Sequence, residues 1–243
     1  MTVEPEEIDE HPPDLSIRAI RGLPEIRPGD DLAGMLADAT TYEDHDVLVV
    51  TQKVVSKAEG RLVDINFDDP RGHKAIVEDE SVRILRRRGD LIISETEHGF
   101  VCANAGIDLS NVEAGQAALL PVDSDRSARR IRDVVRARTG AKIGVIISDT
   151  FGRPWRRGVT DVAIGSAGIG PILDLRGHPD ALGREMQVTE VAIVDELAAA
   201  AELAMGKSAG IPAAVVRGAP AEWFRSGGVV DEIVRSPSED LFR

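Results

Sequence analysis

The chain has 243 residues, of which 42% are hydrophobic and only 3% aromatic, so it can bury one large core of Val, Ile, Leu and Ala. Its formal net charge of -13 argues against nucleic acid as a partner, because phosphate contacts need a basic face. No apolar run approaches the roughly 18 residues of a membrane span. Cys102 is the single cysteine, which excludes an intrachain disulfide and fits a cytoplasmic location.

The first half of the chain is expected to contain a short tail and the start of one domain. Residues 1–14 are acidic and lack the apolar stretch of a signal peptide, so we expect a disordered tail followed by a domain over 15–243. The patterns then predict a strand at 15–20, a helix at 32–40 capped by Asp30 or Asp31, a buried strand at 47–51, and an amphipathic helix at 73–89.

The second half is expected to continue with strands and helices in no strict alternation. The patterns predict a hairpin at 90–108 that turns near His98, a helix at 124–140, a strand at 142–148, a glycine-interrupted strand within 161–177, a helix at 189–206 capped by Thr189, a strand at 211–218 and a short final helix. Because the order is not a regular strand–helix–strand repeat, we predict a mixed α/β sheet rather than a Rossmann fold.

The segment SDTFGRPWRRG places an acid, a hydroxyl and arginines directly after a buried strand. Asp149 and Thr150 end the predicted strand, and Arg153, Arg156 and Arg157 follow. One interpretation is a turn capped by Asp149 with solvated arginines. The other is a metal–phosphate site, in which Asp149 and Thr150 offer oxygens to Mg²⁺ or Mn²⁺ and the arginines neutralise phosphate. Ligands bind at carboxyl ends of strands in α/β sheets, which favours the second interpretation.

Two other segments could contribute to such a site. NAGIDLSN places Asp108 and Asn111 three residues apart, which by itself is best explained as a turn. An ion that holds phosphates usually needs a second carboxylate, however, and Asp108 would be the natural partner of Asp149. Lys53 and Lys57 follow the strand at 47–51 and are either surface charges or contacts to nucleotide phosphates.

The tripeptide GKS at 206–208 resembles part of a phosphate loop but is not a Walker A motif. The upstream glycine spacing is missing, and the tripeptide follows a helix instead of opening one. It is therefore predicted to be a helix end whose backbone N–H groups could still face a nucleotide. The histidines show no metal-ligand spacing and are expected at the surface, whereas Cys102 is expected to be a small core residue.

Several long segments, taken in order, resemble one protein family. They are GLPEIRPGDDL, DVLVVTQKVVSKAEGR, NAGIDLSNV, IISDTFGRPWRRG, TEVAIVDELAAAAELAMGK and IPAAVVRG. Together they resemble coenzyme F-420-0:L-glutamate ligases, the γ-glutamyl ligases of deazaflavin coenzyme biosynthesis, over nearly the whole chain. The resemblance implies a family-specific, two-lobed mixed α/β fold that forms an intertwined homodimer. It also implies that GTP is converted to GDP and phosphate while L-glutamate is joined to F-420-0, with Mg²⁺ or Mn²⁺ required and K⁺ assisting.

The resemblance also implies roles for particular residues. Metal ligands fall on Asp108, Asp149 and Thr150, and the catalytic groups on Asp108, Asp149 and Lys57. The nucleotide contacts fall on Leu23, Pro24, Glu25, Ile26, Gln52, Lys53, Lys57, Asn111, Met205, Gly206, Lys207, Ser208, Ala209, Gly210 and Ile211.

The sequence departs from the family pattern at Lys207, where archaeal members carry an acidic metal ligand in a loop that is one residue longer. Either Lys207 contacts phosphate directly or another oxygen takes over the second metal. Two alternatives to the F-420-0 ligase therefore stay open. One is a ligase of the same fold that acts on another acidic acceptor, and the other is a guanine-nucleotide-binding module without turnover.

Overall fold

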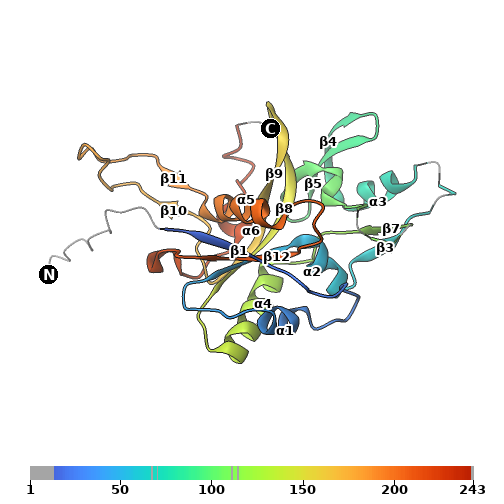
Figure 1. The fold of residues 1–243 in the computed structure, drawn as a ribbon. Coiled ribbons are helices and arrows are strands. Elements are labelled where there is room, and N and C mark those ends of the chain that lie inside the picture. Colours follow the sequence, from blue (N-terminus) through green and yellow to red (C-terminus); the bar gives the residue numbers. More distant parts are fainter. Residues whose placement is uncertain (1–13, 67, 70, 111, 114, 242–243) are drawn as a thin grey trace.

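A five-stranded mixed sheet forms the centre of the computed structural model, which describes residues 14–66, 68–69, 71–110, 112–113 and 115–241 (Figure 1). Its strands lie in the order β1 (Ser16–Ile20), β12 (Ala213–Arg217), β2 (Val47–Thr51), β8 (Gly144–Arg153) and β9 (Arg156–Ala167). Within this sheet β2 and β8 are parallel, and the other neighbouring pairs are antiparallel. The predicted mixed α/β sheet is confirmed, while the predicted tail lies almost wholly outside the described residues.

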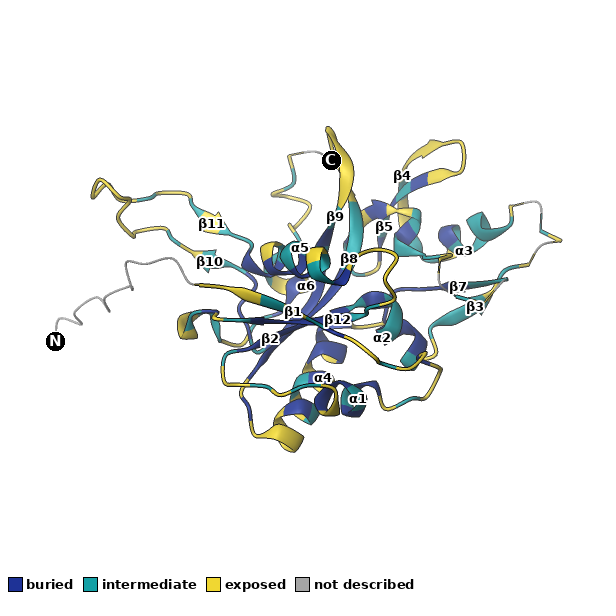
Figure 2. Ribbon diagram, in the orientation of Figure 1, coloured by how far each residue is buried: buried dark blue, intermediate teal, exposed yellow. Residues whose placement is uncertain are grey.

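Helices cover both faces of the central sheet (Figure 1). On one face α4 (Ser124–Thr139) packs against β8 and β9, and α1 (Leu32–Asp38) packs against α4. On the other face α5 (Ile193–Met205) and α6 (Val229–Glu232) pack against β9, and α5 also contacts β1 and β12. Because both faces are covered, the buried stretches of the middle strands are apolar, and residues 47–50 of β2 are completely buried (Figure 2).

Three small sheets and several short helices surround this core. The small sheets are β3 (Leu62–Asp64) with β7 (Gln116–Ala118), β4 (Ser81–Arg88) with β5 (Leu91–Thr96) and β6 (Val101–Ala103), and β10 (Leu173–Asp174) with β11 (Glu190–Val191). The short helices are α2 (Gln52–Ala58) and α3 (His73–Asp79), together with the 3-10 turns Asn104–Gly106 and Ala221–Trp223. No helix in the described part of the chain is both long enough and apolar enough to span a membrane.

Sequence signals at turns and helix ends located several elements correctly. The Asp31 side chain caps α1 by accepting a hydrogen bond from the Gly34 amide at 3.0 Å. Gly140 ends α4 with a positive φ of 81°, a conformation that glycine adopts without steric cost. The hairpin predicted near His98 is the antiparallel pair of β5 and β6.

The predicted helix at 73–89 is wrong beyond Asp79. Helix α3 stops there after two turns, and β4 follows as the partner of β5. Ser81 begins this strand, and its hydroxyl donates to Ser94 at 2.7 Å across the pair. Backbone pairing with β5 therefore overrides the helical spacing of the apolar residues, because strand pairing depends on a partner that local periodicity does not show.

Two further element boundaries differ from the prediction. Thr189 does not cap α5, because its carbonyl accepts from the Leu175 amide beside the β10–β11 pair and the helix begins at Ile193. Strand β8 does not end at Ser148 but continues to Arg153, since β9 pairs with it along that length. Asp149 and Thr150 consequently lie inside a strand rather than at its end.

Candidate functional site

The topology brings several chain segments to one edge of the central sheet. Ile20 at the end of β1 pairs with Ala213 at the start of β12, and Ala213 pairs with Val50 near the end of β2. Thr51, the last residue of β2, pairs with Ser148 in β8. The segments after β1 and β2, the segment before β12 and the middle of β8 therefore meet at this edge.

Strand β8 extends beyond the end of β2, which leaves Asp149 and Thr150 paired only with β9. The register of β8 and β9 shifts between Ile147 and Ser148, as at a β-bulge. Bulges redirect side chains and are frequent beside active sites. Beyond this shift Ser148 and Thr150 point to one face of the strand, since both hydroxyls donate to Asp161, and alternation places Asp149 on the other face.

A cavity of about 530 Å³ lies at this edge, within the size range of small-ligand sites. The residues predicted from the sequence that line it are Leu23, Pro24, Glu25, Ile26, Gln52, Lys53, Lys57, Asp108, Asp149, Thr150, Gly206, Lys207, Ser208, Gly210 and Ile211. Met205 is instead packed in the core and 1% exposed, and Ala209 does not line the cavity. Asn111 lies outside the described residues.

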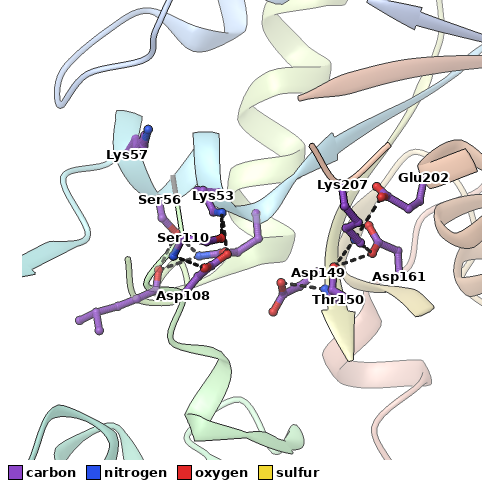
Figure 3. A network of polar contacts seen from close by, with 12 residues as sticks. Lys53, Ser56, Lys57, Asp108, Ser110, Asp149, Thr150, Asp161, Glu202 and Lys207 are labelled. Carbon is purple, nitrogen blue, oxygen red and sulfur yellow. Dashed lines mark hydrogen bonds and ion pairs between the residues drawn. The ribbon is translucent and has the colours of Figure 1, made fainter. Parts of the chain in front are cut away.

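One side of the cavity, which we call the carboxylate half, consists of Asp108, Asp149, Lys53 and Ser110 (Figure 3). Lys53 on α2 forms an ion pair with Asp108 at 2.7 Å and donates to the Ser110 hydroxyl at 2.8 Å. Burial works against the Asp108 charge, but Lys53 and Ser110 outweigh it and keep the pKa of Asp108 below its usual value. Asp108 is therefore ionised at neutral pH.

Asp149 has fewer stabilising contacts than Asp108. Its carboxylate accepts from the Thr150 amide at 2.8 Å, and no lysine or arginine among the described residues forms an ion pair with it. Burial raises the pKa of Asp149 to about 7, only partly offset by the Thr150 hydrogen bond, and the charges of Asp108 and Asp161 raise it further. Cys102 is buried nearby as predicted, and its thiol pKa is raised to about 12, chiefly by burial.

The other side of the cavity, which we call the lysine half, consists of Thr150, Asp161, Glu202 and Lys207 (Figure 3). Lys207 Nζ lies 2.6 Å from Asp161 Oδ1 and 3.2 Å from Glu202 Oε1, and it also donates to the Thr150 hydroxyl. Burial lowers the pKa of Lys207, but Asp161 and then Glu202 outweigh it, so the net pKa is raised. Lys207 is thus charged and in contact with three side-chain oxygens.

The remaining cavity wall comes from the segment after β1 and from α2. Lys57, which is 8% exposed, forms an ion pair with Glu25. Gln52 is almost fully buried, and its amide donates to Ser56 at 2.6 Å and to the Leu119 carbonyl at 2.8 Å. The Gln52 side chain therefore anchors α2 to the segment after β7, while Lys57 stays available to an anion that displaces Glu25.

Sequence analysis missed Asp161 and Glu202 and expected three arginines at the site. A weak signal existed for Asp161, because it is an acid beside the apolar run VAIG, which becomes the buried part of β9. Arg153, Arg156 and Arg157 are exposed at the β8–β9 turn and do not line the cavity. Arg153 there donates to the Arg157 carbonyl at 2.8 Å. The cavity is therefore lined without these three arginines, and their predicted contact with phosphate stays a prediction.

Fold and site together define a mixed α/β protein with a small-ligand cavity at one sheet edge, in which carboxylates and lysines lie side by side. Such a combination of perturbed acids and paired cations in a cavity is typical of enzymes.

Comparison with known proteins gives the family. A family model described as F420-0:Gamma-glutamyl ligase matches residues 22–218. The coenzyme F420:L-glutamate ligase of Methanothermobacter thermautotrophicus is 42% identical over 250 residues, which cover 94% of this chain and 99% of that protein. The enzymes of the same name from Methanopyrus kandleri and Archaeoglobus fulgidus are 43% and 41% identical, covering 95% and 94% of this chain and 98% and 96% of theirs. The chain therefore belongs to the F420-0:gamma-glutamyl ligase family, which is a family of ligases.

Proposed function

We propose that this chain is a GTP-dependent ligase that joins L-glutamate to coenzyme F-420-0 and then adds further γ-linked glutamates. The observation that supports the proposal most is the cavity, where Asp108, Asp149, Lys53 and Lys57 lie together with the segments 23–26 and 206–211. The match covers almost the full length of the relatives, and their names support the choice of acceptor and amino acid.

The chemistry explains why a nucleotide is needed. A carboxylate is a poor electrophile, so an amine does not displace its oxygen directly. Transfer of the γ-phosphoryl group of GTP to the carboxylate of F-420-0 breaks the bond to GDP and forms an acyl phosphate. The glutamate amine then attacks the acyl carbon, loses a proton and expels phosphate, which leaves the amide. Positioning and charge stabilisation provide most of the catalysis in phosphoryl transfer.

The carboxylate half fits a divalent ion such as Mg²⁺ or Mn²⁺. Among the described residues no cluster of three or more His, Cys, Asp or Glu side chains is arranged to hold a metal ion. Two carboxylates completed by phosphate and water oxygens are, however, a usual site for Mg²⁺ bound with a nucleotide. When bound, such an ion would neutralise charge on the phosphoryl oxygens. Asp149 suits this role because no cationic side chain in the described part of the chain is paired with its carboxylate.

The two lysines of α2 are suited to bind the phosphates as point charges. Each is paired with a carboxylate at the cavity wall, Lys53 with Asp108 and Lys57 with Glu25. A triphosphate carries more charge than either carboxylate and can replace it as the partner of the ammonium group. We propose that Lys57 shifts from Glu25 to a phosphate oxygen, while Lys53 stays between Asp108 and the nucleotide.

Other expectations from the family resemblance stay predictions. They are a contribution of K⁺, the two-lobed shape, the intertwined homodimer and the cytoplasmic location. Thr150 as a metal ligand also stays a prediction, and it requires Lys207 to leave the Thr150 hydroxyl. A sizing column with light scattering tests the homodimer, and replacing KCl by NaCl in the assay tests the requirement for K⁺.

The proposed reaction is tested with the purified chain, GTP, Mn²⁺, L-glutamate and F-420-0. We expect phosphate release that requires both glutamate and F-420-0, together with a product that is heavier by one or more glutamyl residues in mass spectrometry. Omitting each substrate in turn is the control, because a simple GTPase would release phosphate without an acceptor.

Two other outcomes identify the alternatives. Phosphate release that requires glutamate and another acidic acceptor, but not F-420-0, would indicate a ligase of the same family with a different acceptor. Binding of GTP, measured by calorimetry, without phosphate release under any combination would indicate a nucleotide-binding module. Either outcome would contradict the proposed function.

A further inference from the structure

The lysine half of the cavity contains a single ammonium group, on a side chain that is about half exposed. An ammonium has three N–H donors and no acceptor. The oxygens in contact with Lys207 Nζ are also three: Asp161 Oδ1 at 2.6 Å, Glu202 Oε1 at 3.2 Å and the Thr150 hydroxyl. All of its donors are therefore used inside the cavity (Figure 3).

The oxygens around Lys207 are satisfied as well. Asp161 is 3% exposed, and its carboxylate accepts from Ser148 at 3.1 Å, from Thr150 at 2.7 Å and from Lys207. Because the Thr150 hydroxyl donates to Asp161, its own oxygen is left to accept from Lys207. Another cation could bind these oxygens only by displacing the ammonium group and breaking this network.

Two carboxylates and a hydroxyl are also the donor types that hard cations prefer. In the lysine half the chain supplies the cation itself, on a side chain from the loop that follows α5. In the carboxylate half Asp149 is paired with no lysine or arginine among the described residues, and Lys53 forms an ion pair with Asp108 alone. The two halves thus differ in whether a cation must come from solution.

We propose that Lys207 is a built-in cation of this active site, and that each chain binds one divalent ion, between Asp108 and Asp149, rather than two. The inference rests on the proposed function, because it assumes that the cavity binds a nucleotide with a divalent ion. The tethered ammonium group supplies a fixed positive charge beside the phosphate site. Unlike a metal ion from solution, this ammonium group does not dissociate from the chain, so the lysine half carries its positive charge at any metal concentration.

Counting bound manganese tests the proposal without measuring turnover. The chain is dialysed to equilibrium against increasing Mn²⁺ with saturating GDP on both sides of the membrane, and the excess manganese on the protein side is measured by elemental analysis. We expect one Mn²⁺ for each wild-type chain. In Lys207→Ala the oxygens of Asp161, Glu202 and Thr150 are released, so we expect two Mn²⁺ for each chain.

Lys142→Ala is the matched control, because the Lys142 side chain is exposed before β8 begins, at the opposite edge of the sheet. It should bind one Mn²⁺, as the wild type does. Lys207→Met keeps most of the aliphatic stem and removes only the charge, so it separates loss of the cation from loss of packing. It should also bind two Mn²⁺, and circular dichroism checks that both Lys207 variants are folded.

The possible results separate this inference from the proposed function. Two Mn²⁺ on the wild-type chain, or none, would overturn the inference, and this count decides the question even where the variants fold poorly. A single Mn²⁺ on every variant would overturn it too, because the lysine half would then have no capacity for a metal. One Mn²⁺ on the wild type and two on the Lys207 variants, in a protein that does not ligate glutamate, would refute only the proposed function.

Discussion

The two halves of the cavity use similar groups in opposite ways. The lysine half places two carboxylates around an ammonium group that the chain itself provides. The carboxylate half also contains two carboxylates and one lysine, but Lys53 contacts only Asp108 and leaves Asp149 without a cationic partner among the described residues. In the first arrangement the chain itself supplies the cation, whereas the second leaves the Asp149 carboxylate without an ion pair in the described part of the chain.

This difference follows from the geometry of strand β8. Thr150 and Asp149 are neighbours in sequence, but alternation along the strand points them to opposite faces. On the Thr150 face, Asp161 of β9 is directly opposite in the register and Lys207 reaches it from the loop after α5. On the Asp149 face no lysine or arginine of the described residues forms an ion pair with the carboxylate. Burial therefore raises the pKa of Asp149 to about 7, and the Thr150 hydrogen bond and the charge of Lys207 offset it only in part. A stable network and a reactive carboxylate therefore share one short stretch of strand.

The largest expected effect comes from Asp149→Asn, which removes the uncompensated carboxylate. We expect turnover to fall about 10³-fold, since the loss of an ion-binding oxygen costs several kcal/mol of charge stabilisation in the transition state. The measurement is kcat for phosphate release with saturating GTP, glutamate and F-420-0. The Asn side-chain oxygen can still accept the hydrogen bond from the Thr150 amide, so we expect a native fold, which circular dichroism checks. Activity within tenfold of wild type would remove Asp149 from the mechanism.

A smaller effect is expected from Lys53→Ala, which removes the lysine of the carboxylate half. Asp108 then loses its ion-pair partner, and the nucleotide loses one cation near its phosphates. We expect the KM for GTP to rise roughly tenfold, in line with the loss of one charge-assisted hydrogen bond of about 1.5 kcal/mol. Lys142→Ala serves again as the control, with an unchanged KM. A kcat that falls while KM stays constant would instead place Lys53 in the transition state rather than in substrate binding.

How much of the site could be predicted from sequence differs between the two halves. Asp149 and Lys53 each come directly after or just beyond an apolar run that predicts a buried strand, and Asp108 was expected as the second carboxylate beside Asp149, so their meeting at one cavity was predictable. Asp161 becomes the partner of Thr150 only through the β8–β9 register, which extends past the predicted end of the strand. Glu202 lies within a helix whose other residues are apolar or acidic, and only the packing of α5 brings it toward Lys207.

The fold shows the same division between local and long-range information. Caps and stops such as Asp31 and Gly140 act within a few residues, and the sequence identified them. Strand β4 and the outer part of β8 depend on partners elsewhere in the chain, and the sequence alone placed both incorrectly. Helix α2 was missed because its seven residues follow β2 without a break, and its position depends on the buried Gln52 contact with Leu119.

Because the pKa of Asp149 is raised, Asp149→Asn is expected to stabilise the folded chain although it lowers activity. The gain in unfolding free energy should be smaller than the loss in transition-state stabilisation. In the folded, metal-free chain this carboxyl has a pKa of about 7, against its ordinary value of 3.8. The folded state therefore binds its proton more tightly, and stability falls as pH rises from about 4 to 7. Asp149→Asn removes this penalty and should be more stable than wild type at pH 7.5 in EDTA, by at least about 1 kcal/mol or 2–4 °C.

Differential scanning calorimetry at several pH values checks this prediction. The advantage of Asp149→Asn should become small near pH 4, where the wild-type carboxyl is protonated in the folded state and roughly 40% protonated in the unfolded state. Mn²⁺ with GDP should reverse the order at pH 7.5, because only the wild type gains stability from binding. Equal melting temperatures for both proteins at pH 4 and pH 7.5 would show that Asp149 is compensated, and the contrast between the two halves would be lost.

The smallest effect is expected at the β8–β9 turn, which tests where the site ends. Arg153 is four residues beyond Asp149 along an extended strand, which separates the two by about 13 Å. Arg156 pairs with Arg153 across the turn. Arg156→Ala should therefore change kcat/KM by less than about twofold, since exposed charges at this distance are screened. A loss of more than tenfold would show that the turn contacts bound substrate or a neighbouring copy of the chain. The cavity would then have a third, basic region, and the comparison of its two halves would be incomplete.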